Sequence, residues 1–350
     1  VFSSSAATLL CHTRALARAA MAPLEEASPP SNPNASGGAA EAAAETTVSS
    51  LPPEKRRDIL AALFPKQAAA ALLANADGAR PEAPWLVARG VIGKGAMAST
   101  CVRRQGTCAV AAVKLEVAPP PANAPREGHC VFGVELPPAS TGDVWRRNRH
   151  PDCRQLSALL TDVLAPCVHT QALLLREGVA SFVLYVDVIV LSDDGAVVDA
   201  AALAAALALR DVVLPVAAPV GTRWCAGPGA EGRKGAVAGG RRVFASDVAD
   251  MPLVSTWIVL PSAARNPCTV CRAPTRFEMD HAPDDATFVT VATARGGALI
   301  CVRTVSGVEG AGLEDGEAFH AENLAIQKAV ECREAHEREL SDALSPKASG

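Results

Sequence analysis

The chain lacks any apolar run long enough to cross a membrane. Its longest runs, such as residues 179–191, are interrupted by Asp187 and fall short of the roughly 20 apolar residues that a spanning helix needs. It also lacks an excess of positive charge, because the formal net charge is −4 and the isoelectric point is near 6.0. Without a general basic field, contact with nucleic acid depends on local patches. We therefore expect no membrane association and no general affinity for nucleic acid.

A disulfide framework is also missing. The eleven cysteines are scattered and no secretory signal precedes them, which is typical of reduced thiols in the cytosol or nucleus. What the chain does have is apolar material: 49% of its 350 residues are hydrophobic and mean hydropathy is +0.17. That suffices for the core of one large domain or two small ones, so disorder throughout is excluded.

The first 50 residues read as a flexible N-terminal extension. Residues 1–20 contain Arg14 and Arg18, many Ser and Ala and no acid, a composition that resembles a mitochondrial transit peptide. The competing interpretation, which we favour, is upstream sequence before a start at Met21. Residues 22–50 offer few large apolar side chains to bury. We expect one domain over residues 51–344 and a short tail over 345–350.

Alternating patterns within residues 51–344 predict an α+β fold. Helical spacing before residue 74 predicts two short helices, and the β and α segments then alternate until a long C-terminal helix over 316–344. This order suits a layered α+β sandwich. The strands are expected at 98–103, 108–117, 130–136, 182–191, 243–245, 255–260, 287–293 and 299–304, with further helices at 152–164 and 198–209.

A glycine-rich segment, GVIGKGAMA at residues 90–98, imitates the phosphate loop of protein kinases, and Lys114 follows it in an Ala-Val-Lys sequence. Phosphoryl transfer also needs a catalytic Asp and metal-binding Asn and Asp residues, and none of the kinase motifs that carry them follows. We expect a tight turn between two strands, with Lys114 at a strand edge.

A second pattern is spread over three segments of the chain: DGARPE at 77–82 followed by Gly90-Val91-Ile92, VLYVDVIVLSDDGAVVDA at 183–200, and residues 255–260. Together these segments resemble the RNase PH-like subunits of the exosome. The first is similar to the motif and first strand that open these subunits, the second to their central strand, turn and helix, and the third to a later strand. The resemblance covers roughly residues 55–344 and implies one RNase PH-type domain, of the ribosomal protein S5 domain 2-like kind, with a β-meander, β/α layers and a long C-terminal helix.

The resemblance also bears on catalysis. Phosphorolysis needs Arg and backbone N–H groups to hold phosphate, and a carboxylate at the scissile bond. Active members carry a Gly-Gly-Thr-Arg turn, whereas here residues 192–196 read Ser-Asp-Asp-Gly-Ala. That turn has no Arg, and its two carboxylates would repel phosphate. The acid expected at the start of the later strand is replaced at about Ser255, and Asp247 and Asp250 lie outside the matched position. We expect Asp187 to be a structural or interface acid.

Two clusters are candidate binding sites. Cys268 and Cys271 have half the spacing of a zinc site, but no second pair follows and His281 is the nearest histidine, so we favour a loop with two thiols over zinc. No metal or other cofactor is expected. A basic cluster could guide RNA, with a solvated loop as the alternative. The candidate RNA-binding residues are Arg146, Arg147, Arg149 and Arg154. A second basic set, expected in a mobile surface loop, is Arg233, Lys234, Arg241 and Arg242.

The function implied by the resemblance is assembly: a catalytically inactive ring subunit that supports 3′–5′ RNA processing and degradation, including rRNA maturation. The implied partners are other RNase PH-like ring subunits, S1/KH-type cap subunits, exosome-associated nucleases and single-stranded RNA, in the nucleus, nucleolus and cytoplasm. An active phosphorolytic 3′–5′ exoribonuclease is the alternative, and a mitochondrial RNA-processing protein is a third interpretation that depends on residues 1–20.

Overall fold

A computed structural model describes residues 62, 64–74, 83–137, 152–221, 223–260, 269–283, 285–306 and 315–345. The chain divides into two compact units, residues 1–75 and 76–350. In the first unit, helix α4 (Pro65–Ala74) begins at a proline, which is favourable because the first turn of a helix leaves its N–H groups unused. The earlier residues of the expected helix pair lie outside the described residues, apart from Ala62 and Phe64.

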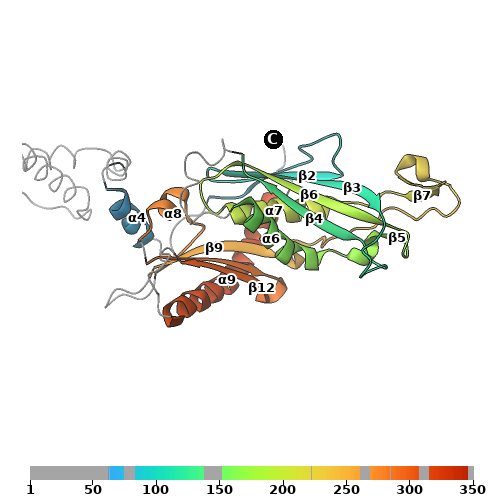
Figure 1. Ribbon diagram of the computed structural model, residues 1–350. Coiled ribbons are helices and arrows are strands. Elements are labelled where there is room, and N and C mark those ends of the chain that lie inside the picture. Colours follow the sequence, from blue (N-terminus) through green and yellow to red (C-terminus); the bar gives the residue numbers. More distant parts are fainter. Residues whose placement is uncertain are drawn as a thin grey trace, which may run out of the picture. The chain divides into compact units, whose positions relative to one another are not determined.

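The first sheet of the second unit is built around one long strand, β6 (Ala180–Ser192). Its strands run in the order β1 (Leu86–Arg89), β2 (Ala98–Arg104), β3 (Thr107–Ala118), β6 and β4 (His129–Glu135), and β5 (Leu174–Arg176) pairs with the start of β6 (Figure 1). Neighbours are antiparallel except β4 and β6, which are parallel.

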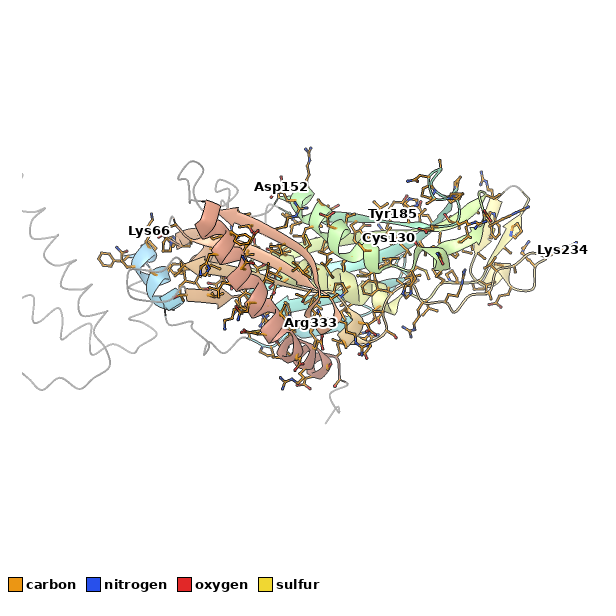
Figure 2. The ribbon with its side chains drawn as sticks, turned by 90° about the horizontal axis from the view of Figure 1, so that it is seen from below. Lys66, Cys130, Asp152, Tyr185, Lys234 and Arg333 are labelled. Carbon is orange, nitrogen blue, oxygen red and sulfur yellow. The ribbon has the colours of Figure 1, made fainter. Side chains whose placement is uncertain are left out.

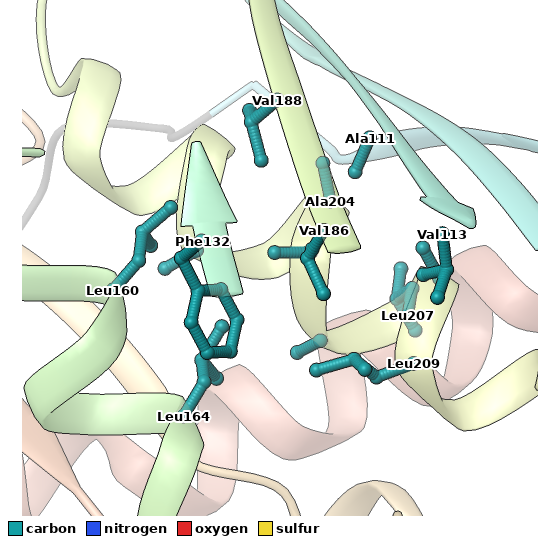
Figure 3. Packing of buried hydrophobic residues seen from close by; sticks show 14 of the residues in the cluster. Ala111, Val113, Phe132, Leu160, Leu164, Val186, Val188, Ala204, Leu207 and Leu209 are labelled. Atoms are coloured by element: carbon teal, nitrogen blue, oxygen red, sulfur yellow. The ribbon is translucent and has the colours of Figure 1, made fainter. Parts of the chain in front are cut away.

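One face of this sheet is buried and the other is largely open. Along β6, Phe182, Val186 and Val190 are fully buried, whereas Ile189 and Leu191 on the opposite face are exposed. This period of two is the pattern of a strand with one covered face. Helices α6 (Cys153–Leu164) and α7 (Val197–Asp211) cover the buried face. Figure 3 shows Phe132 of β4 beside Leu160 and Leu164 of α6.

Helix α7 is buried on all sides from Val197 to Leu209. Its many alanines allow close approach on every face, as expected for a helix enclosed within a protein. It contacts β2, β3 and β6 of the first sheet and also β9 (Leu253–Leu260) of the second. The central helix therefore joins the two sheets.

The second sheet has the order β10 (Thr269–Arg272), β9, β11 (Thr287–Thr293) and β12 (Leu299–Ser306), all antiparallel. Helix α9 (Asp315–Leu344) packs against it through Ala321, Ala325 and Ala329. On the same helix, Arg333 (labelled in Figure 2) donates to the carbonyl oxygens of Met251 at 2.9 Å and Ala249 at 3.1 Å. These bonds fix the C-terminal helix to the segment before β9.

Smaller elements complete the fold. The β7 (Ala217–Val220) and β8 (Arg223–Ala226) strands form a hairpin, and α8 (Arg276–His281) starts with a capping box between Thr275 and Glu278. Single 3-10 turns span Ala165–Cys167, Thr170–Leu173, Pro228–Ala230, Val248–Asp250 and Arg295–Gly297. Within the described part of the chain, no helix is long and apolar enough to cross a membrane.

The expected α+β class with a long C-terminal helix is confirmed, but two expected strands are wrong. Residues 243–245 form no strand: Val243 and Phe244 are buried in the core without a strand partner. The first strand is Leu86–Arg89, and Gly90–Ile92 is an exposed connection. In both cases short apolar runs reflect burial or a turn rather than strand pairing, and local pattern does not separate these.

The kinase-like segment is a connection between β1 and β2, as expected, with positive φ at Gly90 and Gly95. Lys114 does not lie at a strand edge, because β3 is an inner strand of the sheet. Its ammonium group lies on the open face and pairs with Asp187 at 2.8 Å. Asp187 thus has a structural partner on the open face of the sheet, and a role for it at a subunit interface stays a prediction.

Candidate functional site

The turn between β6 and α7 is held from two sides. The Thr107 hydroxyl at the start of β3 donates to the carbonyl oxygen of Gly195 at 2.7 Å and accepts from the N–H of Asp194 at 2.8 Å. Gly195 has φ +98°, and a Cβ there would lie 2.2 Å from the carbonyl oxygen of Pro274. Ala196 follows with φ +46° and caps α7 without a side-chain hydrogen bond. The close approach of Pro274 and the positive φ require glycine at position 195.

A cavity of about 360 Å³ opens where α7 begins. It lies between α6, α7, β9, β11 and β12, with Met279 of α8 at one wall, and most of its lining is aliphatic or aromatic. Hydroxyl groups come from β9, β11 and β12. The lining residues are Gln155, Leu156, Ala158, Leu159, Asp193, Ala196, Val197, Val198, Thr256, Met279, Phe288, Thr290, Arg303, Thr304 and Val305.

The electrostatics of the cavity do not favour an anion. Arg303 is the single cation among its lining residues, and its Nη2 donates to Asp162 Oδ2 at 2.6 Å. This hydrogen bond raises the pKa of Arg303, so the guanidinium is charged but already paired. Asp193 also lines the wall, and its Oδ1 accepts from the N–H of Gly195 at 2.9 Å. A phosphate would therefore meet one neutralised cation and one acid.

We expected both carboxylates of the turn to repel phosphate, but only that of Asp193 belongs to a residue that lines the cavity. Asp194 is absent from the cavity wall, and its side chain packs beneath the β2–β3 turn, so close that a Cβ on Gly106 would lie 2.7 Å from it. Burial raises the pKa of Asp194. Its role is to fill the space under the hairpin, and Asp193 alone faces the cavity.

The residue that faces the cavity from β9 is Thr256 rather than Ser255. The Ser255 hydroxyl accepts from the indole N–H of Trp257 at 2.9 Å and is buried. Thr256 donates twice to the carboxylate of Asp199, from its N–H at 3.0 Å and its hydroxyl at 2.6 Å. In place of an acid, β9 therefore contributes the hydroxyl group of Thr256 to the cavity wall.

Asp199 is a buried acid that sequence reasoning did not single out. It lies in the first turn of α7, and burial raises its pKa from 3.8 to about 6, an effect opposed by the Thr256 hydrogen bonds and the charges of Arg272 and Arg104. An acid inside an otherwise apolar helical stretch was the signal available, since such groups need partners when buried. Both Asp199 oxygens are used by Thr256, so the group braces α7 against β9.

The basic cluster is described only in part. Arg146, Arg147 and Arg149 lie outside the described residues, and Arg154 stands in the first turn of α6. Arg154 borders an open depression of about 520 Å³ that also includes Glu135 and Asp187. The charge around Arg154 is therefore mixed.

Part of the second basic set contacts the rest of the domain, and the expected mobility of this loop stays a prediction. Arg242 donates to the carbonyl oxygen of Arg210 at 3.1 Å, and Arg241 donates to the carbonyl oxygen of Leu174 at 3.5 Å. Burial lowers the pKa of Arg241. Lys234 is exposed. These contacts tie residues 241–242 to the domain.

Asp247, Asp250 and Cys271 are not among the residues that line the cavity. Asp250 pairs with Arg295 at 2.7 Å, and Asp247 accepts from the N–H of Ala249. Cys271 is buried in β10 rather than in a loop, and Cys268 lies outside the described residues. Among the described residues, no group of three or more His, Cys, Asp or Glu is placed to hold a metal ion.

The chain is similar to known proteins in its sequence and in its fold. Residues 84–215 match the model of the 3′ exoribonuclease family, domain 1 (RNase PH). An exosome complex component, rrp43 of Schizosaccharomyces pombe, is 31% identical over 130 residues, which are 34% of this chain and 45% of that protein. The chain thus matches less than half the length of this relative. The expected resemblance to RNase PH-like exosome subunits is confirmed.

Two solved structures share the fold. A chain of the Archaeoglobus fulgidus exosome with RNA bound to the active site superposes with a TM-score of 0.58 and 21% identity, over 79% of this chain and 97% of that one. A chain of an archaeal exosome core gives a TM-score of 0.57 and 21% identity, over 81% and 98%. The chain therefore has the RNase PH-like fold of exosome core subunits, and its residues 84–215 are the part that matches domain 1 of the 3′ exoribonuclease family.

Proposed function

We propose that this chain is a ring subunit of an RNA exosome that has no phosphorolytic activity of its own. The observation that carries the proposal is the cavity at the start of α7: it lies beside the turn where active members bear Arg, yet it is lined mainly by apolar side chains. Its single guanidinium, Arg303, is paired with Asp162. Electrostatic stabilisation of a reacting phosphate needs preorganised donors, and this pair supplies little net charge.

Assembly is the activity that remains for such a domain. The open face of the first sheet exposes Val131, Ile189 and Leu191, and β4 and β12 lie at sheet edges. Exposed apolar strands and free edges favour pairing with other subunits. We propose RNase PH-like neighbours in a ring, S1/KH-type cap subunits and associated nucleases as partners. The proposed roles are RNA processing and degradation, including rRNA maturation, in the nucleus, nucleolus and cytoplasm.

A nuclease assay tests the lack of phosphorolysis. The full chain is incubated with poly(A) with and without inorganic phosphate, and nucleoside diphosphates are measured because phosphorolysis transfers phosphate to the released nucleotide. We expect no phosphate-dependent release. The matched variant is Ala158→Trp, which places an indole at the cavity mouth from an exposed helical position. Release that depends on phosphate and disappears in Ala158→Trp would establish the alternative, an active exoribonuclease.

A second experiment tests assembly. Tagged full-length chain is purified from cells, and the proteins that accompany it are identified and sized by sedimentation. We expect several RNase PH-fold proteins and S1- or KH-domain proteins in one particle. Recovery of the chain as a monomer, without such proteins, would contradict the ring assignment. Imaging of the same cells tests the proposed nuclear, nucleolar and cytoplasmic distribution.

A further inference from the structure

Two thiols meet on the open face of the first sheet. Cys101 of β2 and Cys108 of β3 have their sulfur atoms 3.6 Å apart, and both are partly exposed. Val102 and Ala109, their chain neighbours, point into the core with no exposed surface, so the two cysteines share the outer face. Among the described residues, this is the one pair of cysteines with a direct sulfur–sulfur contact.

The strand register argues against a disulfide here. Cys101 lies opposite Val110, and Cys108 lies opposite Arg103, so the two cysteines are diagonal neighbours rather than a directly opposed pair. Diagonal positions in an antiparallel pair are about 7–8 Å apart. An unstrained disulfide needs Cα atoms within about 6.8 Å and sulfurs near 2.05 Å. Closing the observed 3.6 Å gap would therefore distort the hairpin.

The same gap suits an atom held between the two sulfurs. A thiophilic atom bonded to sulfur at about 2.3 Å spans two sulfurs 3.6 Å apart when the S–X–S angle is about 100°. Two bonds then form with little movement of either strand. A cross-strand chelate fits this hairpin where a disulfide does not.

The number of ligands selects the kind of atom. A zinc ion takes four ligands, and among the described residues no group of three or more His, Cys, Asp or Glu is placed to hold a metal ion. The trivalent arsenic of an arsenoxide needs only two sulfurs, because its organic group fills the third position and its oxygen leaves with both thiol protons.

We propose that Cys101 and Cys108 form a dithiol site for trivalent arsenic of the arsenoxide class. An arsenoxide, R–As=O, reacts with the two thiols to give a cyclic dithioarsinite and one molecule of water. Two S–H bonds break, two As–S bonds form, the oxygen leaves as water, and no atom changes oxidation state. The site is independent of the proposed ring function, because it depends only on the β2–β3 hairpin.

Phenylarsine oxide is the probe that tests the site. Because Cys268 and Cys271 lie close in sequence and could form a second dithiol, all proteins carry Cys268→Ser. The test variants are Cys101→Ser and Cys108→Ser, and the matched control is Cys225→Ser, an exposed single thiol. Stoichiometry is read by native mass spectrometry and by the loss of thiols that react with a chromogenic disulfide.

The background protein and the Cys225→Ser control should bind one phenylarsenic group each and lose two thiols on binding. Each test variant should bind at least about 100-fold more weakly, since the second bond is no longer intramolecular. Circular dichroism should show all of them folded. Equal affinity in Cys101→Ser would overturn the proposal. A Cys101–Cys108 disulfide that forms with diamide and leaves thermal stability unchanged would also overturn it, because the hairpin would then accommodate a disulfide without distortion.

Discussion

The burial of Asp199 predicts a pH dependence that can be measured directly. Its carboxylate accepts two hydrogen bonds from Thr256, and its pKa is raised from 3.8 to about 6 in the folded protein. A raised pKa means that the folded state holds the proton more tightly. The resulting stabilisation is complete below about pH 4 and is lost as the pH rises through 6.

The magnitude follows from the shift of about two pKa units. At about 1.4 kcal/mol per unit, the contribution of Asp199 falls by about 3 kcal/mol in total, of which about 2 kcal/mol falls between pH 4.5 and 7.5. Asp199→Asn keeps the size of the side chain but does not titrate. The difference in unfolding free energy, wild type minus variant, should therefore decrease by about 2 kcal/mol across that range. The hydrogen bonds that the amide makes change this free-energy difference by the same amount at every pH, so they do not affect how it varies with pH.

Urea unfolding followed by circular dichroism, at half-unit steps from pH 4.5 to 7.5, measures this difference. Asp187→Asn is the control, because Asp187 is a half-exposed partner of Lys114 and exposed pairs contribute at most about 1 kcal/mol. Taking the difference between proteins cancels the titration of every other group. Parallel curves for wild type and Asp199→Asn would refute the assignment of a raised pKa to this buried acid.

Three further predictions concern the turn, the core and the basic cluster. Gly195→Ala should lower the free energy of unfolding by more than about 2 kcal/mol, because it combines strain at positive φ with a backbone clash, whereas Gly178→Ala, at positive φ in open space, should lower it by about 1 kcal/mol. Chemical denaturation measures both losses, and equal losses would contradict the clash at Gly195. Phe182→Ala removes a fully buried ring and should cost about 3–5 kcal/mol in the same assay, while a loss below about 1 kcal/mol would show a core that collapses around the gap. Replacing Arg146, Arg147 and Arg149 together by Glu should leave ring assembly intact, but it should weaken RNA protection by the complex and flatten the salt dependence of that protection. Unchanged protection at low salt would show that these arginines lie in a solvated loop.

Periodic segments were predictable because their burial repeats with the period of the element itself. The β-branched run along residues 182–191 predicted β6, and the stretch 198–209, apolar except for Asp199, predicted α7. The C-terminal helix, expected over 316–344, spans Asp315–Leu344. Short elements such as β7 and β10 were missed, because four residues carry too little pattern to stand out from a loop.

The candidate site was predictable in place but not in composition. The motif resemblance located the turn before α7 and the loss of its Arg. Which side chains face the cavity depends on strand orientation, and a shift of one residue exchanges the two faces. For this reason Thr256 lines the wall where Ser255 was expected to matter, and Asp194 turns under the hairpin while Asp193 faces the cavity.

The sequence by itself determined the α+β class, the order of the main elements and the RNase PH-like turn, since these depend on local period and on residues close together in the chain. The tertiary structure decided the chemistry of the cavity. Arg303 and Asp162 are 141 residues apart, and Asp199 and Thr256 are separated by 57, so their pairing arises only when sheet, helix and register are assembled. Charge neutralisation and burial are properties of neighbours in space, and the spacing of these residues along the chain carries no trace of them.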